Sequence, residues 1–191
     1  MSAHIASAGC IPKYYGIIAD DRKALSDAVA KAFLECDIVL LSGGVSRGDY
    51  DYVPEVLEEN GMSILFHRVA IKPGRPLLFG RKQNTFVFGL PGNPVSTFVT
   101  FEVFVQTLIY HLSGLDYKPS IYQGKLSKRI KRRDTERTEF LPVIIRGENV
   151  KPIKYMGSSH LNAMAEANGM ITIPNGVAEF KEGETVSVRS I

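Results

Sequence analysis

Short apolar runs alternate with amphipathic stretches through the first part of the chain. The runs Tyr14 to Ile18, Asp37 to Leu41 and Phe86 to Phe88 have the length and side-chain content of buried strands. Between the first two, apolar residues at helical spacing predict a helix from Arg22 to about Glu35, and Asp20-Asp21 stands where a cap is needed. This alternation is typical of an α/β sandwich with helices on both faces of a sheet.

The same pattern predicts the other elements of this first unit. The helix from Arg22 carries its apolar face on Leu25, Val29, Ala32 and Phe33. The further expected elements are a helix over Tyr52 to Asn60 closed by Gly61, an extended stretch from Ser63 to Ile71, a hairpin of Leu77 to Gly80 with Thr85 to Phe88, and a long helix from Pro94 to about Leu112. No apolar run is expected to span a membrane.

The pattern changes near Lys118, where short alternating segments separated by Gly, Pro and Asn turns replace the long helices. They are Ile121 to Leu126, Phe140 to Ile145, Val150 to Tyr155, Met170 to Ile173 and Thr185 to Val188, with one brief helical stretch near Leu161 to Ala167. Many short strands in a small unit favour a β-barrel or sandwich. The sequence therefore predicts an α/β domain over 1–116 and a small β-barrel domain over 117–191.

Charge and cysteine content restrict the classes of function. The formal net charge of +3 is too small to indicate nucleic-acid binding. Positive charge is concentrated in one run, which is expected to be a solvated hairpin or, alternatively, to flank a site for an anion: Lys125, Lys128, Arg129, Lys131, Arg132 and Arg133. Cys10 and Cys36 lack metal-ligand spacing and are expected to be reduced thiols. The start of the chain does not read as a signal peptide, so a cytoplasmic protein is expected.

Two glycine-centred loops follow predicted strands and carry most of the candidate chemistry. The first contains Ser42, Gly43, Gly44, Val45, Ser46 and Gly48, and the second contains Pro91, Gly92 and Asn93. Loops at the carboxyl ends of strands expose backbone N–H groups, and the following helix directs its positive dipole end toward an anion. Neither loop has the pattern of a nucleotide P-loop or of a dinucleotide fold. We therefore expect a binding site for a phosphate or a pterin.

Acidic and basic residues near these loops suggest further ligands. Asp49 and Asp51 follow the first loop, where they either cap the next helix or hold Mg²⁺ against a substrate phosphate, and Asp20 has the same ambiguity. Between the loops, the turn Lys72-Pro73-Gly74-Arg75-Pro76 places two cations on a proline-stiffened segment. Such a pair suits a small oxyanion, although a surface turn is the alternative interpretation.

Several segments resemble the molybdopterin molybdotransferase family, the molybdenum insertases that include the E domain of gephyrin. The segments are SGGVSRGDYDYVPEVLEENG, HRVAIKPGRPLLFG and FGLPGNPVSTFVTFEVFV, followed by GSSHLNAMAEANGMITIP and GETVSV, which are similar to the C-terminal barrel of the family. The resemblance covers nearly the whole chain in order. It implies a three-layer α/β/α molybdopterin-binding domain followed by a β-barrel, and a reaction that inserts molybdate into adenylylated molybdopterin with release of AMP.

The resemblance also implies roles for particular residues. The first glycine loop and Pro91, Gly92 and Asn93 would bind the pterin and its phosphate, and Asp20 and Asp51 would hold Mg²⁺ and act in hydrolysis. The implied molybdate site consists of Lys72, Arg75, Pro76, Ser96, Arg137 and Ser158. Two departures from the family pattern stand out: Arg75 replaces the usual second lysine of the turn, which changes a point donor into a planar fork, and Pro142 stands where a basic residue often follows the Glu-Phe pair.

The resemblance bears on partners as well. Family members have two further domains before this region and an opening strand with a TGDE-like turn, so we expect a truncated product, a fragment or half of a split protein. The expected partners are a second copy or the N-terminal half of the insertase, and a molybdopterin adenylyltransferase. Three alternatives stay open: an adenylyltransferase-like domain, a non-enzymatic interaction module like that of gephyrin, and an inert fragment.

Overall fold

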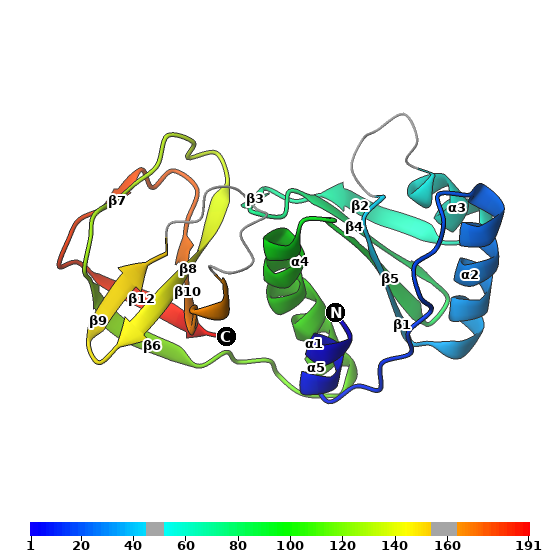
Figure 1. The fold of residues 1–191 in the computed structure, drawn as a ribbon, viewed down its shortest axis with the longest axis horizontal. Coiled ribbons are helices and arrows are strands. Elements are labelled where there is room, and N and C mark those ends of the chain that lie inside the picture. The colour runs from blue at the N-terminus through cyan, green and yellow to red at the C-terminus, as the bar shows by residue number, and fades with distance from the viewer. Residues whose placement is uncertain (45–51, 154–163) are drawn as a thin grey trace.

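The computed structural model describes residues 1–44, 52–153 and 164–191 of the chain. An α/β unit and a β-barrel unit follow one another along the molecule (Figure 1). The α/β unit consists of α1 (Ser2–Ser7), α2 (Arg22–Glu35), β1 (Ile38–Ser42), α3 (Val53–Glu59), β2 (Ser63–Arg68), β3 (Ile71–Lys72), β4 (Pro76–Lys82), β5 (Thr85–Leu90), α4 (Pro94–Thr100), the π-helical turn η1 (Phe101–Val105) and α5 (Gln106–Leu112). The predicted α/β class and nearly all its predicted elements are thus confirmed.

A four-stranded sheet forms the centre of the α/β unit, with the order β1-β5-β4-β2. β1 and β5 are parallel, whereas β5, β4 and β2 pair in antiparallel fashion. Val29 of α2 and Val56 and Leu57 of α3 pack with Val87 in a cluster on one face of the sheet. Phe101, Val105 and other residues of the long helix pack on the opposite face together with Ile5 of α1. The unit therefore has the expected three layers.

The long helix from Pro94 to Leu112 is continuous but contains the π-helical turn η1 in its middle. With 19 residues and a mean hydropathy of 1.3 it is long and apolar enough to cross a membrane, so the expectation that no segment reaches that limit was wrong. Core helices of globular proteins can reach the same length and mean hydropathy. Val95, Val99, Phe101, Val105 and Ile109 of this helix are buried in the structure. Phe101, Val105 and Ile109 pack with residues of the sheet, and Val99 packs with Phe140 and Met170 of the barrel, which accounts for their apolar character.

The predicted strand from Tyr14 to Ile18 is absent. These residues are extended without secondary structure, and Ile11 to Ile18 form no backbone hydrogen bond with the described residues. Strand propensity forms a strand only where a neighbouring strand supplies the ladder. β1 pairs with β5 alone among the described strands, so its other edge has no partner there. Tyr14 and Ile17 consequently stay exposed, at 74% and 95%.

The second unit is a closed β-barrel, as the short alternating segments predicted. Its elements are β6 (Ile121–Leu126), β7 (Ile130–Lys131), β8 (Thr138–Arg146), β9 (Asn149–Pro152), β10 (Gly169–Ile173), β11 (Glu179–Phe180) and β12 (Thr185–Ser190). The order β10-β12-β6-β9-β8 closes through pairing of β10 with β8. Val143, Val150, Ile171 and Val188 belong to its core. Of the helical stretch expected near Leu161 to Ala167, residues 161–163 lie outside the described part of the chain, and a short helical turn is present at Met164 and Ala165.

Three kinds of contact join the two units. β3 of the α/β unit pairs in parallel with β8 of the barrel. Beside this pairing, Ile71 and Val99 pack with Phe140 and Met170 in one apolar cluster. Arg189 of β12 reaches the long helix, where it forms an ion pair with Glu102. Backbone, apolar and ionic contacts together hold the barrel against the domain that carries the glycine loops.

Candidate functional site

The two glycine loops lie side by side at the carboxyl ends of adjacent parallel strands. Ser42 is in register with Leu90, and the Gly43 N–H donates to the Leu90 carbonyl at 3.2 Å. A Cβ atom at Gly92 would lie 3.3 Å from the Gly43 Cα, so the two loops approach closely. Gly43 and Gly44 have φ values of 87° and 66°, a region that favours glycine. The structure therefore brings these described loop residues together.

The second loop leads directly into the long helix. Asn93 is the N-cap residue of α4, and Pro94 occupies the first helical turn. The Thr97 side chain donates to the Asn93 carbonyl at 2.9 Å and so closes the turn. The buried Asn93 Oδ1 has no hydrogen-bond partner among the described residues. The helix start thus presents a dipole end and a buried polar atom next to the glycine loops.

The turn from Lys72 to Pro76 packs against the first part of the same helix. Gly74 has a φ of 105°, and a Cβ atom there would lie 2.6 Å from the Thr100 Cγ2 and 3.7 Å from the Ser96 carbonyl oxygen. The Arg75 carbonyl accepts a hydrogen bond from the Val69 N–H at 3.1 Å, which closes the turn, and the Arg75 side chain is exposed. The start of α4 therefore connects the glycine loops with the basic turn.

The barrel brings further charged side chains to this turn. β3 and β8 align Lys72 with Glu139, and the Lys72 Nζ lies 3.1 Å from the Glu139 Oε1. The Arg132 Nε lies 3.0 Å from the other carboxylate oxygen of Glu139. Arg132 had been expected in a solvated hairpin, but it is buried because Glu139 and several carbonyl groups surround it. The prediction of a fully solvated basic run was wrong at this residue.

Arg137 lies directly before the segment that pairs with β3. Its Nε donates to the Asp134 Oδ2 at 3.0 Å. This hydrogen bond lowers the pKa of Asp134, and the backbone N–H of Glu136 and the charge of Lys72 act in the same direction. The Thr138 N–H donates to the Ala70 carbonyl at 3.0 Å, so the backbone of Arg137 lies next to the segment that carries Lys72, where the two units meet. Ser96 lies on the helix against which the turn of Gly74 packs.

The acidic residues are only partly described. Asp21 caps α2 by accepting from the Ala24 N–H at 2.7 Å, so the exposed Asp20 is not used for this purpose. Residues 1–44, 52–153 and 164–191 contain no cluster of three or more His, Cys, Asp or Glu side chains suited to a metal. The predicted site residues Val45, Ser46, Gly48, Asp51 and Ser158 lie outside the described residues, as does Asp49.

Sequence reasoning missed Glu139, Asp134 and the buried position of Arg132. One signal was available: Glu139 is a charged residue within the apolar strand β8, where burial requires a charged partner. Identifying that partner required the pairing of β3 with β8, which joins two units distant in sequence.

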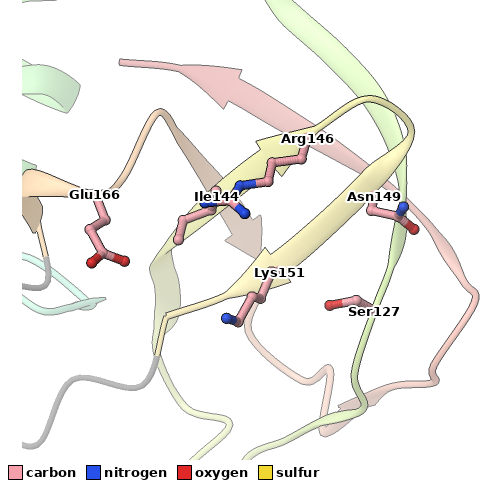
Figure 2. A pocket seen from close by; sticks show the side chains of 6 residues that line it. All are labelled: Ser127, Ile144, Arg146, Asn149, Lys151 and Glu166. Atoms are coloured by element: carbon pink, nitrogen blue, oxygen red, sulfur yellow. The ribbon is translucent and has the colours of Figure 1, made fainter.

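A recess of about 450 Å³ lies elsewhere, on the barrel (Figure 2). Figure 2 shows Ile144, Arg146 and Lys151 on the hairpin of β8 and β9. The other lining residues are Ser127, Asn149 and Glu166. None of the predicted site residues lines this recess.

Comparison with known proteins agrees with this arrangement. Residues 1–111 match the family described as "Probable molybdopterin binding domain", and residues 123–191 match "MoeA C-terminal region (domain IV)". The second match does not favour the alternative of an adenylyltransferase-like domain. The chain is 30% identical over 190 residues to a molybdopterin molybdenumtransferase of Bacillus subtilis, covering 97% of this chain and 44% of the relative. A protein of the same name from Haemophilus influenzae is 35% identical over 180 residues, covering 91% and 44%.

Solved structures give the same result. A molybdenum cofactor biosynthesis protein from Pyrococcus furiosus matches with a TM-score of 0.82 and 28% identity, covering 100% of this chain and 62% of that one. A molybdopterin biosynthesis MoeA protein from Pyrococcus horikosii matches with a TM-score of 0.84 and 31% identity, covering 98% and 46%. The chain thus spans less than half the length of the curated relatives described above. By its two matched regions and its fold, the chain belongs to the MoeA-type family of molybdenum cofactor biosynthesis.

Proposed function

We propose that this chain binds molybdopterin and molybdate as part of a molybdopterin molybdotransferase, which inserts molybdate into adenylylated molybdopterin and releases AMP. One observation carries the proposal: the second glycine loop lies against Gly43 and opens the long helix at Asn93, and the basic turn packs on the same helix at Thr100, at the end of α4. A phosphate-binding loop beside an oxyanion site is what this reaction requires. The names of the curated relatives support the same activity.

In this proposal the glycine loops bind the pterin and its phosphate. Ser42, Gly43 and Gly44 form the start of the first loop, in which the Gly43 N–H is already bonded to the Leu90 carbonyl, and Gly92 and Asn93 lie beside them at the helix start. Successive backbone N–H groups in a turn form a concave array of donors that suits an anion. Pro91, Val45, Ser46 and Gly48 complete the proposed binding segment.

Molybdate would bind where the α/β unit meets the barrel. Lys72 and Arg75 supply positive charge, and Ser96 lies in the first turn of the helix. Arg137 would add a planar guanidinium from the barrel side. Charge-assisted hydrogen bonds contribute about 1.5–3 kcal/mol each, so several donors suffice to hold a small dianion. Pro76 and Ser158 are included as residues that border the anion.

Asp20 and Asp51 are proposed to hold Mg²⁺. The residues around Asp20 fit such an ion because Asp20 is exposed, and because α2 leads directly into β1, which places the start of α2 at the same end of the unit as Ser42. Mg²⁺ commonly takes one or two carboxylates together with substrate phosphates, and when bound it would neutralise charge on the pyrophosphate.

Asp51→Asn tests this assignment in a protein that carries the full region of the relatives. We expect the variant to bind molybdopterin with unchanged affinity and to lose most AMP release, because the amide keeps the shape of the side chain and removes its charge. AMP release measured by chromatography at the normal rate would mean that Asp51 serves only to cap a helix.

Anomalous diffraction from crystals soaked in molybdate or tungstate tests the proposed oxyanion site directly. The expected result is a metal peak bordered by Lys72, Ser96 and Arg137. A peak elsewhere, with none at the boundary of the two units, would contradict the placement.

The proposal includes partners, a cellular location and a larger assembly. A molybdopterin adenylyltransferase would supply the adenylylated substrate, and the reaction is proposed to take place in the cytoplasm. We further propose that a second copy of the chain, or a polypeptide carrying the remaining region of the relatives, completes the active cleft. Mixing the chain with such a polypeptide should restore cofactor synthesis. Full activity of the chain alone, as a monomer in sedimentation, would contradict this part of the proposal.

A further inference from the structure

Glu139 lies between two cations at the boundary of the two units. One carboxylate oxygen lies 3.1 Å from the Lys72 Nζ, and the other lies 3.0 Å from the Arg132 Nε. The side chains of Glu139 and Arg132 are 9% and 3% exposed, whereas that of Lys72 is 44% exposed. The buried end of this chain of charges is therefore in the barrel, and its accessible end is the Lys72 ammonium.

The protein itself holds the Arg132 guanidinium in place, and the NH1 group donates to protein carbonyl oxygens and not to a ligand. That atom donates to the carbonyl oxygens of Ile173, Pro174 and Val177, and the NH2 atom donates to the Arg137 carbonyl. The carbonyl oxygens accept hydrogen bonds but carry no net charge. The negative charge that neutralises the Arg132 guanidinium is therefore that of the Glu139 carboxylate. Arg132 thus places a fixed positive charge beside the Glu139 carboxylate, and its bond to the Arg137 carbonyl restrains the backbone at Arg137.

We propose that Glu139 is a positioning residue that fixes the Lys72 ammonium for oxyanion binding. This inference rests on the proposed function, since it assigns Glu139 a role in the proposed molybdate site. Register explains the precision of the arrangement: β3 and β8 set Lys72 directly opposite Glu139. A lysine side chain loses rotamer freedom when it is fixed, and an ion pair formed before the ligand arrives removes that cost from binding.

Replacing Glu139 should either strengthen or weaken anion binding, and the direction separates a positioning role from a purely electrostatic one. Glu139 is negative, and removing a negative charge beside an anion site should strengthen anion binding if charge alone matters. If Glu139 instead holds Lys72 in place, its removal should weaken binding. Arg132 makes the second outcome the expected one, because its charge already offsets that of Glu139.

Calorimetric titration of the chain with molybdate tests this prediction in two variants. Glu139→Gln keeps the volume, but its single carbonyl oxygen can accept from only one of the two cations. Glu139→Asp keeps the charge but is one methylene too short to span both contacts. We expect both variants to weaken molybdate binding by about tenfold, the lower end of the effect of groups that orient ligands at metal sites. Tighter binding by Glu139→Gln, or unchanged binding by both variants, would overturn the proposal.

Two controls separate positioning from loss of structure. Glu148→Gln removes one negative charge from the exposed turn between β8 and β9 of the same barrel, and it should leave molybdate binding unchanged. In a Lys72→Met background, Glu139→Gln should produce no further loss, because the group that Glu139 positions is gone. Additive losses would show that Glu139 acts on binding by another route.

A readout independent of molybdate keeps this inference distinct from the proposed function. Acetylation of lysine amines, followed by mass spectrometry, reports how accessible and mobile Lys72 is. We expect labelling of Lys72 to rise several-fold in Glu139→Gln relative to the wild type, while Lys125 on the same barrel is labelled equally in both. If the wild-type chain does not bind molybdate, the proposed oxyanion site fails while the labelling result still decides the positioning. Unchanged labelling of Lys72 would overturn the positioning role whatever molybdate does.

Discussion

Gly43 illustrates how one residue links backbone geometry to the proposed binding site. Its φ of +87° disfavours any side chain, and no described atom lies within 4 Å of the position that a Cβ would occupy. We expect Gly43→Val to lower the free energy of unfolding by about 1–2 kcal/mol through backbone strain. We also expect at least a tenfold loss of AMP affinity in calorimetry, because the side chain would fill space needed by the ligand.

Gly183 offers a matched control for this substitution. It has a φ of +79° with no atom within 4 Å of the added Cβ, and it lies in a turn of the barrel. Gly183→Val should cost similar stability while AMP binding stays unchanged. Equal loss of affinity in both variants would mean that strain, and not the ligand-binding position, explains the Gly43 result.

His4 makes stability depend on pH. Its ring packs on Phe98 and Phe101 at centroid distances of 5.2 and 5.4 Å. Burial lowers the pKa of His4 below 6.5, and the positive N-terminus acts in the same direction. Between the folded and unfolded pKa values the unfolded chain binds more protons, so stability is present above about pH 6.5 and decreases as the pH falls.

We expect His4→Gln to reduce the difference in Tm between pH 7.5 and pH 5.5, since the variant cannot be protonated at this position. His111→Gln serves as the comparison because His111 is exposed at the end of α5. If both variants keep the wild-type pH dependence, His4 is not the titrating group.

At the scale of elements, the long helix organises the candidate site. Its N-cap Asn93 lies beside the glycine loops, and Thr100, at the end of α4, contacts the basic turn through Gly74. The Thr100 hydroxyl donates to the Ser96 carbonyl at 2.8 Å, which leaves the methyl group to pack against Gly74. The turn and the helix are therefore fitted to each other.

Gly74→Ala tests this fit. The new Cβ would lie 2.6 Å from the Thr100 Cγ2, at a φ of +105°. We expect a loss of about 3 kcal/mol in urea unfolding, from overpacking together with backbone strain. Thr100→Ser removes the clashing methyl and retains the hydroxyl, so it should recover part of the loss in the double variant. Strictly additive effects would contradict direct contact between the turn and the helix.

At the scale of the whole molecule, Arg189 joins the barrel to the long helix. It pairs with Glu102 at 3.6 Å, donates to the Tyr117 hydroxyl at 2.9 Å, and lies over the Tyr117 ring. Burial raises the pKa of Glu102, and the Arg189 charge opposes this rise. The pair therefore stabilises the contact between the two units only while both partners are present.

We expect Arg189→Met to lower the free energy of unfolding by about 3 kcal/mol, because Glu102 would be left buried without its partner. We also expect calorimetry to resolve two transitions for this variant and one for the wild type. Arg129→Met is the matched control: Arg129 pairs with Glu179 on the barrel surface, where solvent screens the charges, and its loss should change the stability little. A single transition with an unchanged midpoint in Arg189→Met would contradict this coupling role.

Local patterns in the sequence were sufficient to predict most elements and one half of the candidate site. The helix over Arg22–Glu35 and the hairpin of β4 and β5 follow from apolar spacing and turn residues. The two glycine loops were expected to form an anion site because both follow strands, and in the structure Gly92 and Gly43 lie close together. The domain limits 1–116 and 117–191, and the ligand roles of individual residues, stay predictions.

Only the tertiary structure decided where long-range partners lie. Tyr14 to Ile18 has strand composition but no neighbouring strand among the described residues, so it stays extended. Arg132 belongs to a basic run that reads as solvated, yet the closed barrel buries it against Glu139. Lys72 meets Glu139 because β3 pairs with β8. Helix periodicity and turn chemistry are local properties of a sequence, whereas strand pairing and burial of charge depend on which distant segments the fold brings into contact.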